Sequence, residues 1–341
     1  MLIKACITYL SATQVEVYCY FTIMAYVKLH FILLIIFIGL FANNVHSHLS
    51  HKFYSKTCPQ ALSIVKEGVV EAIKNETRVG ASLLRVHFHD CFVDGCDGSI
   101  LLDNSATIQS EKQAVPNNNS ARGFEVVDHI KANLEKACPG VVSCADILAI
   151  IARDAVVHYG GPTWKVRLGR RDSMTASRAT ANKSIPAPFF NLNNLTSSFA
   201  AQGLTFKDMV VLSGAHTVGF ARCTNFRSHI YNDTNIDTSF AKSLQQTCPK
   251  SGSDNVLQPL DLQTRFIFDN KYYQNLLVHK GLLHSDQQLF NGNKADKLVR
   301  RFANDQHKFF KDFAKSIVKM GNINLLTGTN GEIRLNCRKP N

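Results

Sequence analysis

A chain of 341 residues with a hydrophobic content of 45% is long enough for one large domain or two ordinary ones, and apolar enough for a sizeable core. Lysine and arginine outnumber aspartate and glutamate by 38 to 26, which gives a formal charge of +12. The basic residues are scattered in runs of no more than two and no nucleic-acid-binding motif is present, so nucleic acid is not expected as a partner. The charge instead favours weak adsorption to acidic polymers outside the cell.

The first distinctive segment is a run of twelve residues, 31–42, that is apolar apart from one glycine and is preceded by Lys28. Twelve apolar residues are too few to span a bilayer comfortably, whereas they match the apolar region of a secretory signal peptide. We therefore expect residues 1–47 to be a targeting segment, and the mature protein to have no stable association with a membrane. An uncleaved membrane anchor is the alternative, and the shortness of the run argues against it.

Small residues follow the apolar run at the spacing of a signal-peptide cleavage site. Val45 and Ser47 would occupy positions −3 and −1, which places the start of the mature chain near His48. Counted from Met24, the signal has ordinary length and a charged residue of its own, so residues 1–23 would be an upstream extension. A single secreted domain is then expected over residues 48–341.

Ten cysteines are present, of which Cys6 and Cys19 precede the expected cleavage site. An even number of cysteines in an exported chain indicates disulfides, here four, although spacing alone leaves 105 pairings open. Asn-x-Ser/Thr sequons agree with passage through a glycosylating secretory route. The remaining cysteines are Cys58, Cys91, Cys96, Cys138, Cys144, Cys223, Cys248 and Cys337, and the sequons begin at Asn75, Asn118, Asn182, Asn194 and Asn232.

Apolar residues recur at helical spacing over most of the mature chain, whereas strand patterns are few and short. Ser143 and Thr205 are each followed at the third position by aspartate, which is the pattern of a capping box and predicts the start of a helix. No linker interrupts the chain, so we predict one mostly helical, all-α domain. The expected helices cover residues 59–75, 79–92, 124–137, 144–159, 206–212, 268–279 and 304–320, and the expected strands cover 164–168 and 332–335.

The most informative segment is residues 81–102, which read ASLLRVHFHDCFVDGCDGSILL. Arg85 and His89 are four residues apart and therefore share one face of the expected helix. A neutral imidazole beside a guanidinium could move a proton between the two oxygens of a peroxide while the guanidinium stabilises the developing charge. The alternative is that this pair is only a partly buried polar face of a helix.

Oxygen atoms suited to calcium follow directly after His89. Ca²⁺ takes six to eight oxygen ligands from carboxylates, carbonyls and hydroxyls, and this segment supplies all three kinds. The ligands would be Asp90, the carbonyls of Val93 and Gly95, Asp97 and Ser99.

Two cysteines, Cys91 and Cys96, flank these oxygens and could close a small loop that fixes the carbonyls. A zinc site formed by these cysteines with His87 and His89 is the alternative. The exported context favours a disulfide and argues against zinc.

A second histidine, His216, lies in the segment DMVVLSGAHTVGFARC, residues 208–223. Ser213, Gly214 and Ala215 precede it, and their small side chains leave room for a flat cofactor. Histidine is a common proximal ligand of haem iron. The alternative is a histidine that merely ends a helix, where the helix dipole favours its charge.

Taken together, these segments resemble the class III secretory plant peroxidases. The resemblance extends over the whole mature chain, from FYSKTCP (53–59) to TGTNGEIRLNC (327–337). It implies an all-α haem peroxidase fold in which two helical halves enclose one haem b, with two Ca²⁺ ions. It also implies a monomeric extracellular enzyme of the cell wall that reduces hydrogen peroxide and oxidises phenolic donors by one-electron steps. The matching motifs are RVHFHDCFVDGCDGSILLD, NSARGF, VSCADILAIIARDAV, LGRRDS, LSGAHTVGFARC and FDNKYY followed by SDQQLF.

The resemblance assigns a role to each residue that matches a family motif. His89 would be the distal acid–base with Arg85 as its partner, and Asn117 would hydrogen-bond His89 and fix its tautomer. His216 would be the axial haem ligand, and Asp286 would accept a hydrogen bond from it.

The resemblance also implies the metal ligands, the disulfides and part of the donor site. Pro186 would border the donor site at the haem edge, where Val115 stands in place of an aromatic residue found in some members. Glu111 would join the distal calcium through water, and Asn118 is expected to be buried beside Asn117. The proximal calcium ligands would be Thr217, Asp261, Thr264, Ile267 and Asp269, and the disulfides Cys58–Cys138, Cys91–Cys96, Cys144–Cys337 and Cys223–Cys248.

Two rival functions fit parts of this pattern. A calcium-bound wall protein without catalytic activity would have no need of Arg85, His89 and His216 together. An intracellular peroxidase would not need a signal segment or eight cysteines. Both rivals are therefore disfavoured by the sequence.

Overall fold

The computed structural model describes residues 24–31, which are helical, and residues 49–341. The chain divides into two units, Met1–Ser47 and His48–Asn341. Residues 1–23 and 32–48, which hold most of the apolar run and the expected cleavage site, lie outside the described residues. None of the described helices is both long enough and apolar enough to cross a membrane.

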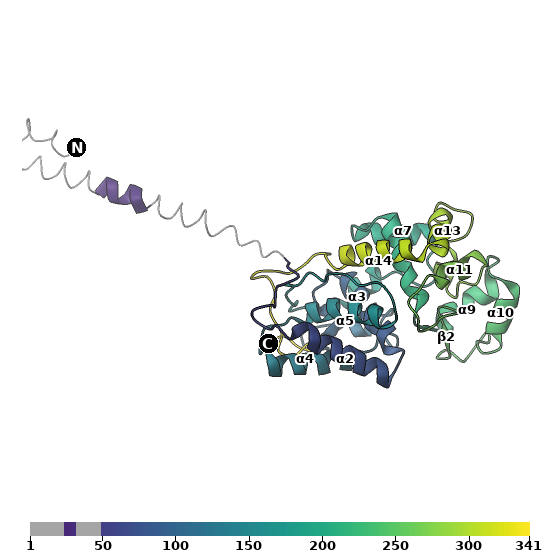
Figure 1. Ribbon diagram of the computed structural model, residues 1–341, viewed down its shortest axis with the longest axis horizontal. Coiled ribbons are helices and arrows are strands. Elements are labelled where there is room, and N and C mark those ends of the chain that lie inside the picture. The colour runs from purple at the N-terminus through teal and green to yellow at the C-terminus, as the bar shows by residue number, and fades with distance from the viewer. Residues whose placement is uncertain (1–23, 32–48) are drawn as a thin grey trace, which may run out of the picture. The chain divides into compact units, whose positions relative to one another are not determined.

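The unit His48–Asn341 is mostly helical, which confirms the all-α prediction, and Figure 1 shows its helices in two groups. Its α-helices are α2 (Ala61–Asn75), α3 (Val79–Cys91), α4 (Phe124–Ala137), α5 (Cys144–His158), α6 (Arg178–Ser184), α7 (Leu192–Ala201), α8 (Phe206–Ser213), α9 (Cys223–Asn232), α10 (Thr238–Gln245), α11 (Lys271–Leu277), α12 (His284–Gln287), α13 (Asp296–Asn304) and α14 (Gln306–Met320). Three short 3₁₀ helices, η1 (Ser99–Leu101), η2 (Glu111–Gln113) and η3 (Gly214–Thr217), and two strands, β1 (Phe220–Arg222) and β2 (Leu257–Pro259), complete the described elements.

Helix α5 is the centre of the first group, and α2, α3 and α4 pack around it. Nearly every residue of α5 is buried, as expected for a helix that is apolar on all sides. Helices α2 and α4 approach closely at Gly68, where an added Cβ would lie only 2.5 Å from Cγ1 of Ile130. Helix α3, which carries Arg85 and His89, packs against α5 and α2 of this group.

The second group is built around α8, α11, α13 and α14, with aromatic side chains between them. Phe268 and Phe309 stack with their ring planes 8° apart, and Phe313 and Phe302 meet them edge-on or tilted. A smaller separate core lies between α9, α10 and the segment before α12, and it includes Phe226, Ile230, Phe240, Leu244, Leu282 and Leu283. Together these two cores hold η3 and α12, which carry His216 and Asp286.

The expected helices agree with the structure best where a helix has both an apolar stripe and a capping residue. Helix α4 has the predicted bounds, and α8 begins with the predicted capping box, in which Thr205 and Asp208 bond each other's backbone N–H. At α5 only half of the predicted box forms, because the Asp146 carboxylate instead accepts hydrogen bonds from Tyr54 and from the N–H of Gly169.

The two expected strands were wrong. Segment 164–168 pairs only through Leu168 with Ser50, and segment 332–335 pairs only through Glu332 with Asp172, so neither continues as a ladder. The strands that do form, β1 and β2, are antiparallel and three residues long. The helix expected over 268–279 is also shorter, because the N–H of Phe268 bonds Tyr159 and His279 has a positive φ of 57°.

Among residues 49–341, four disulfides form, and they are the four pairs that the family resemblance implies: Cys58–Cys138, Cys91–Cys96, Cys144–Cys337 and Cys223–Cys248. Because Cys91 and Cys96 are bonded to each other, the alternative zinc site that would use both thiolates is wrong. The Cys144–Cys337 bond spans 193 positions of the sequence and attaches the C-terminal segment to the start of α5.

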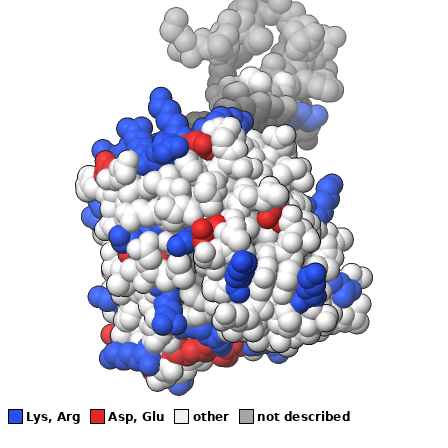
Figure 2. Space-filling view, turned by 90° about the vertical axis from the view of Figure 1, so that its right-hand side faces the viewer, with Lys and Arg blue, Asp and Glu red and all other residues white. Residues whose placement is uncertain are grey.

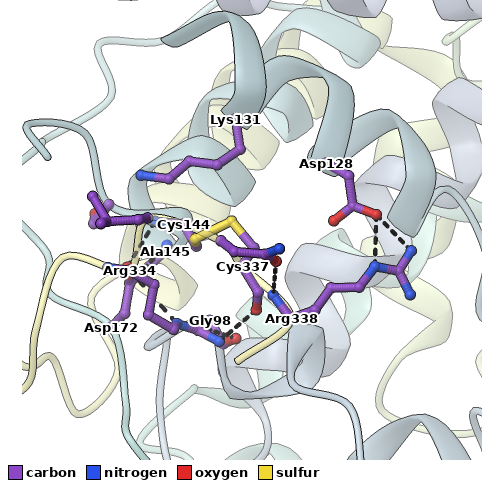
Figure 3. Close-up of a disulfide and its surroundings, with 12 residues drawn as sticks. Gly98, Asp128, Lys131, Cys144, Ala145, Asp172, Arg334, Cys337 and Arg338 are labelled. Atoms are coloured by element: carbon purple, nitrogen blue, oxygen red, sulfur yellow. Dashed lines mark hydrogen bonds and ion pairs between the residues drawn. A yellow bond between two sulfur atoms is a disulfide. The ribbon is translucent and has the colours of Figure 1, made fainter. Parts of the chain in front are cut away.

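A buried carboxylate lies beside the Cys144–Cys337 disulfide (Figure 3). Asp172 accepts hydrogen bonds from the backbone N–H groups of Cys144 (3.0 Å) and Ala145 (2.8 Å), which are unpaired donors in the first turn of α5. It also accepts one from the N–H of Arg334 (3.0 Å). Asp172 therefore caps α5 and fixes the C-terminal segment with one side chain.

The guanidinium of Arg334 is fully buried in the same place. It donates to the carbonyl of Cys337 at 2.7 Å and to the carbonyl of Gly98 at 2.5 Å, and its Nε lies 3.9 Å from Asp172. Gly98 lies between Asp97 and Ser99, so Arg334 connects the C-terminal segment to the loop that holds the expected distal calcium ligands.

We expect Arg334→Ala to lower the free energy of unfolding by about 3–5 kcal/mol, because it leaves the Asp172 carboxylate buried without its charge partner. Arg338→Ala is the matched control: Arg338 pairs with Asp128 and Asp103 at the surface and should contribute about 1 kcal/mol or less. Guanidinium chloride unfolding followed by circular dichroism measures both. Equal destabilisation by the two variants would contradict the role of Arg334.

Candidate active site

Helix α3 presents His89 toward the segment 114–121. The Nδ1 atom of His89 lies 2.5 Å from Oδ1 of Asn117, and Nδ2 of Asn117 donates to the carbonyl of Glu111 at 2.8 Å. Because a carbonyl only accepts, this second bond fixes the orientation of the amide and leaves its oxygen facing His89. Nδ1 of His89 therefore carries the hydrogen, and the lone pair is on Nε2, where it can accept a proton.

Arg85 is held by the same segment, one helical turn before His89. Its guanidinium donates to the hydroxyl of Ser120 at 2.8 Å and to the carbonyl of Pro116 at 2.9 Å. Neither Ser120 nor Pro116 was predicted to have a role, although Ser120 lies in the NSARGF motif. One loop thus orients both distal side chains.

The protonation states of this pair follow from its surroundings. Burial, and then the nearby charge of Arg85, hold the pKa of His89 well below its usual value, so the imidazole is neutral near pH 7. Burial lowers the pKa of Arg85 to about 10, which leaves the guanidinium charged. The pair therefore combines a neutral base with a fixed cation.

His216 lies in η3, immediately after α8, and its side chain is 37% exposed. Its Nδ1 lies 2.7 Å from Oδ1 of Asp286, a carboxylate that is 2% exposed. Asp286 also accepts a hydrogen bond from the hydroxyl of Tyr272 (2.9 Å), a contact that the sequence analysis missed. The motif FDNKYY contains Tyr272 but does not by itself indicate this role.

These contacts fit a haem ligand. A metal-binding histidine characteristically donates one ring N–H to a carboxylate or carbonyl, which fixes the ring and leaves the other nitrogen for the metal. Among the residues that the structure describes, Nε2 of His216 has no hydrogen-bond partner. His216 and Asp286 thus have the arrangement expected of an axial ligand and its supporting carboxylate.

The expected distal calcium ligands lie around one buried loop. The Asp90 carboxylate accepts from the N–H of Gly98 (3.1 Å), and the Asp97 carboxylate accepts from the N–H of Ser99 (3.0 Å). Burial raises the pKa of Asp97 to about 6 and that of Glu111 to about 8, and burial with the neighbouring charges of Asp97 and Glu111 raises the pKa of Asp90 well above normal. Three carboxylates gathered in this way favour a bound cation.

Two polar atoms in this loop support the same conclusion. Within residues 24–31 and 49–341, the hydroxyl of Ser99 and the Oε2 atom of Glu111 are buried without a hydrogen-bond partner. Buried polar atoms normally have a partner, and a hard cation is one that suits oxygen. The other Glu111 oxygen accepts from the N–H of Ser177 at 3.1 Å. The carbonyls of Val93 and Gly95 belong to the same turn, in which the N–H of Asp97 bonds the Gly95 carbonyl.

The expected proximal calcium ligands also come together. The hydroxyl of Thr217 lies 3.2 Å from carboxylate oxygens of both Asp261 and Asp269, and the hydroxyl of Thr264 lies 3.1 Å from Asp269. Burial raises the pKa of Asp261, and the charge of Asp269 adds to the shift. The N–H of Ile267 bonds the Thr264 carbonyl, which places Ile267 in the same turn. The oxygen-rich donor set suits Ca²⁺.

The expected donor-site residues lie near the protein surface. Val115 is 84% exposed, and its N–H bonds the side chain of Asn182 at 2.7 Å, which places it beside α6. Pro186 is partly buried just after α6, and Phe189, which the sequence analysis did not assign, is 68% exposed.

Comparison with known proteins agrees with this geometry. Residues 65–305 match the family model described as peroxidase. Peroxidase 4 of Vitis vinifera is 58% identical over 306 residues, which cover 89% of this chain and 95% of the relative. Peroxidase 70 of Zea mays is 57% identical over 297 residues, covering 86% and 92%. The lignin-forming anionic peroxidase of Nicotiana sylvestris is 53% identical over 297 residues, covering 87% and 92%.

The chain therefore belongs to the class III plant peroxidases, as the motifs predicted. It is a peroxidase, an oxidoreductase that takes hydrogen peroxide as one substrate and an electron donor as the other. The non-catalytic wall protein considered from the sequence is thereby set aside. The family implies haem as the cofactor.

Proposed function

We propose that this enzyme is a secreted peroxidase in which His216 binds the haem iron and His89 and Arg85 handle hydrogen peroxide. The observation that carries the proposal is the pair of histidine contacts, the buried one of His89 with Asn117 and the partly buried one of His216 with Asp286. When bound, haem would supply the redox chemistry by which one hydrogen peroxide oxidises two donor molecules by one electron each. Overall, one hydrogen peroxide and two phenols give two waters and two phenoxyl radicals.

The distal residues provide the proton transfer and the charge stabilisation. Nε2 of His89 accepts a proton from one peroxide oxygen and delivers it to the other, which leaves as water. The Arg85 guanidinium stabilises the negative charge that develops on the leaving oxygen. Asn117 keeps the hydrogen on Nδ1 and so keeps Nε2 available. Peroxide-dependent oxidation of a simple phenol tests this proposal, and an Arg85→Leu variant should oxidise it far more slowly than the wild type.

Phenolic donors, including lignin precursors, are proposed for the exposed surface near Pro186. The name of the Nicotiana sylvestris relative, a lignin-forming peroxidase, supports this donor class. Val115 and Phe189 are exposed apolar side chains that could contact an aromatic ring there. Steady-state kinetics with a series of phenols would test the assignment, which predicts that Phe189→Ala raises KM for the phenol more than for peroxide.

We further propose two Ca²⁺ ions, one bound by each of the two oxygen clusters described above. Asp90 adjoins His89, so a distal ion held by Asp90, Asp97 and Ser99 fixes the end of the helix that presents the base. Without the ion, the gathered carboxylates would repel one another and displace that end of α3.

Chelation of calcium should therefore slow the reaction with peroxide before it unfolds the protein. A small displacement of a catalytic group can cost about 100-fold in rate, while the four disulfides should preserve the helical fold. Stopped-flow kinetics and circular dichroism after chelation, with metal analysis, measure both effects. If calcium leaves and the peroxide rate is unchanged, these oxygens do not position His89.

Secretion to the cell wall is proposed from the signal segment, the four disulfides and the sequons. All five sequon asparagines are exposed, so the expectation that Asn118 is buried beside Asn117 was wrong. Asn117 is held in the interior by its bonds to His89 and to the carbonyl of Glu111, whereas Asn118 is exposed. N-terminal sequencing of secreted protein should find the mature chain beginning near His48, and a start within residues 1–23 would contradict the proposed processing.

The mature enzyme is proposed to be a monomer that adsorbs weakly to acidic wall polymers. Figure 2 shows Lys and Arg outnumbering Asp and Glu on one face, mostly dispersed, with one gathering at the upper left. Dispersed charge supports salt-sensitive adsorption rather than a specific site. Elution of a monomer from an acidic polysaccharide column at moderate salt would agree with this, and retention at high salt would not.

A further inference from the structure

A cluster of two histidines and one aspartate lies on α9, α12 and the loop after α9, and it shares no residue with either oxygen cluster. Nδ1 of His229 on α9 and Nδ1 of His284 on α12 each lie 2.5 Å from the same atom, Oδ2 of Asp233. The three atoms lie within 4.8 Å of one another. The side chain of His229 is 1% exposed, whereas those of Asp233 and His284 are 20% and 27% exposed.

A neutral His229 has one ring N–H, but both of its ring nitrogens face oxygen atoms that act as acceptors. Nε2 of His229 lies 3.2 Å from the carbonyl of Gly281, which can only accept, so Nε2 carries the hydrogen. A neutral His229 then has a lone pair on Nδ1, and this lone pair faces the carboxylate oxygen of Asp233. Nδ1 of His229 and Oδ2 of Asp233 are 2.5 Å apart, and as two acceptors they would repel each other unless a proton or a metal cation lies between them.

We propose that His229, Asp233 and His284 form a binding site for a divalent transition metal, with Zn²⁺ as the foremost candidate. Two imidazole nitrogens and one carboxylate oxygen are a ligand set that zinc accepts, with a water in the fourth position. The bond from His229 to Gly281 is the outer contact that orients a metal-binding histidine. The alternative is that His229 carries a second ring hydrogen and pairs with the Asp233 carboxylate without a metal.

The partly exposed side chains give an ion access from solvent. Ligands held about 2.0–2.2 Å from a metal lie about 3 Å or more from one another, so the Asp233 carboxylate must withdraw by roughly half an ångström or more on binding. Asp233 directly follows the last residue of α9 and is partly exposed, and its side chain can make this movement.

The three ligands are supplied by segments that the fold holds firmly. Helix α9 begins at Cys223, which is bonded to Cys248, and the loop after α9 is attached where the N–H of Asp237 bonds the carbonyl of His279. Helix α12 follows Leu283, which is buried in the smaller core. The site therefore has a preformed frame, and α12 also carries Asp286, two residues after His284.

Calorimetric titration of the haem- and calcium-loaded enzyme with Zn²⁺ tests the proposal. Excess Ca²⁺ keeps zinc from binding at the two oxygen clusters. We expect one zinc per chain, with affinity lowered by more than about 100-fold in His284→Gln, because loss of a ligand should exceed the 10–100-fold effect of losing an outer partner. His307→Gln, which removes an exposed histidine at the start of α14, is the matched control and should bind zinc as the wild type does.

Crystals soaked in zinc provide a readout that does not depend on the variants folding. Anomalous scattering at the zinc edge should give a peak about 2.0–2.2 Å from Nδ1 of His229, Nδ1 of His284 and Oδ2 of Asp233. No zinc uptake by the wild type, equal affinity in the wild type and His284→Gln, or a peak only at other histidines would overturn the proposal. The first of these outcomes would assign His229 as an imidazolium paired with Asp233.

Discussion

His216→Ala is expected to abolish retention of haem, whereas His89→Ala is expected to retain haem and lose most of its reactivity with peroxide. The two histidines differ in their partners: His216 is held by the buried carboxylate of Asp286, and His89 by the amide of Asn117. General acid–base catalysis contributes about 10²–10⁴-fold, and removal of His89 should lower the rate of reaction with peroxide by at least that factor. Haem content from the visible spectrum and stopped-flow mixing with peroxide measure the two effects.

The control for both variants is His158→Ala, which removes an exposed histidine from the last turn of α5. It should bind haem and react with peroxide as the wild type does. Equal loss of haem from His89→Ala and His216→Ala would contradict the division of roles between the two histidines.

Asp286→Asn is expected to lower the affinity for haem and the rate with peroxide by about 10–100-fold each. The substitution removes the charge that raises the basicity of His216, and outer partners of metal ligands typically contribute effects of this size. Asp286 is almost fully buried, so solvent cannot replace the lost interaction. Titration of the haem-free protein with haem gives the affinity, and stopped-flow mixing gives the rate.

Tyr272→Phe is the matched control for Asp286→Asn. It removes the second hydrogen bond to the carboxylate but leaves the bond to His216 intact. We expect a smaller effect on both quantities than Asp286→Asn produces. If Tyr272→Phe weakens haem binding as much as Asp286→Asn, the carboxylate acts through Tyr272 and not through His216.

Several helices could be predicted because the capping residues and the spacing of side chains in the sequence agree with the way these helices start and pack in the structure. Helix α8 has a complete capping box at Thr205, and α3 has the spacing that places Arg85 and His89 on one face. The strands β1 and β2 could not be predicted, because three residues are too few for an alternating pattern. Segment 164–168 has a strand-like composition but only one residue to pair with, Ser50.

The site could be predicted only in part from local patterns, since its partners are distant in the sequence. Asp286 lies 70 positions after His216, and only the family resemblance connected them. The same is true of the disulfides, which cysteine spacing left open. The roles of Ser120 and Tyr272 were not predicted, although each residue lies in a recognised motif. Neither side chain is charged, and neither is a residue type that by itself indicates a ligand.

The visible spectrum of the purified enzyme, taken alone, with one equivalent of hydrogen peroxide, and after addition of a phenol, shows directly whether His216 binds haem and whether the bound haem reacts with peroxide. We expect a haem band that shifts with peroxide and returns to its original position when about two equivalents of the phenol have been consumed. His89→Ala, measured in parallel, should show the initial band but a much slower shift. A protein that lacks the band, or a band that peroxide leaves unchanged, would contradict the assignment of His216 and His89.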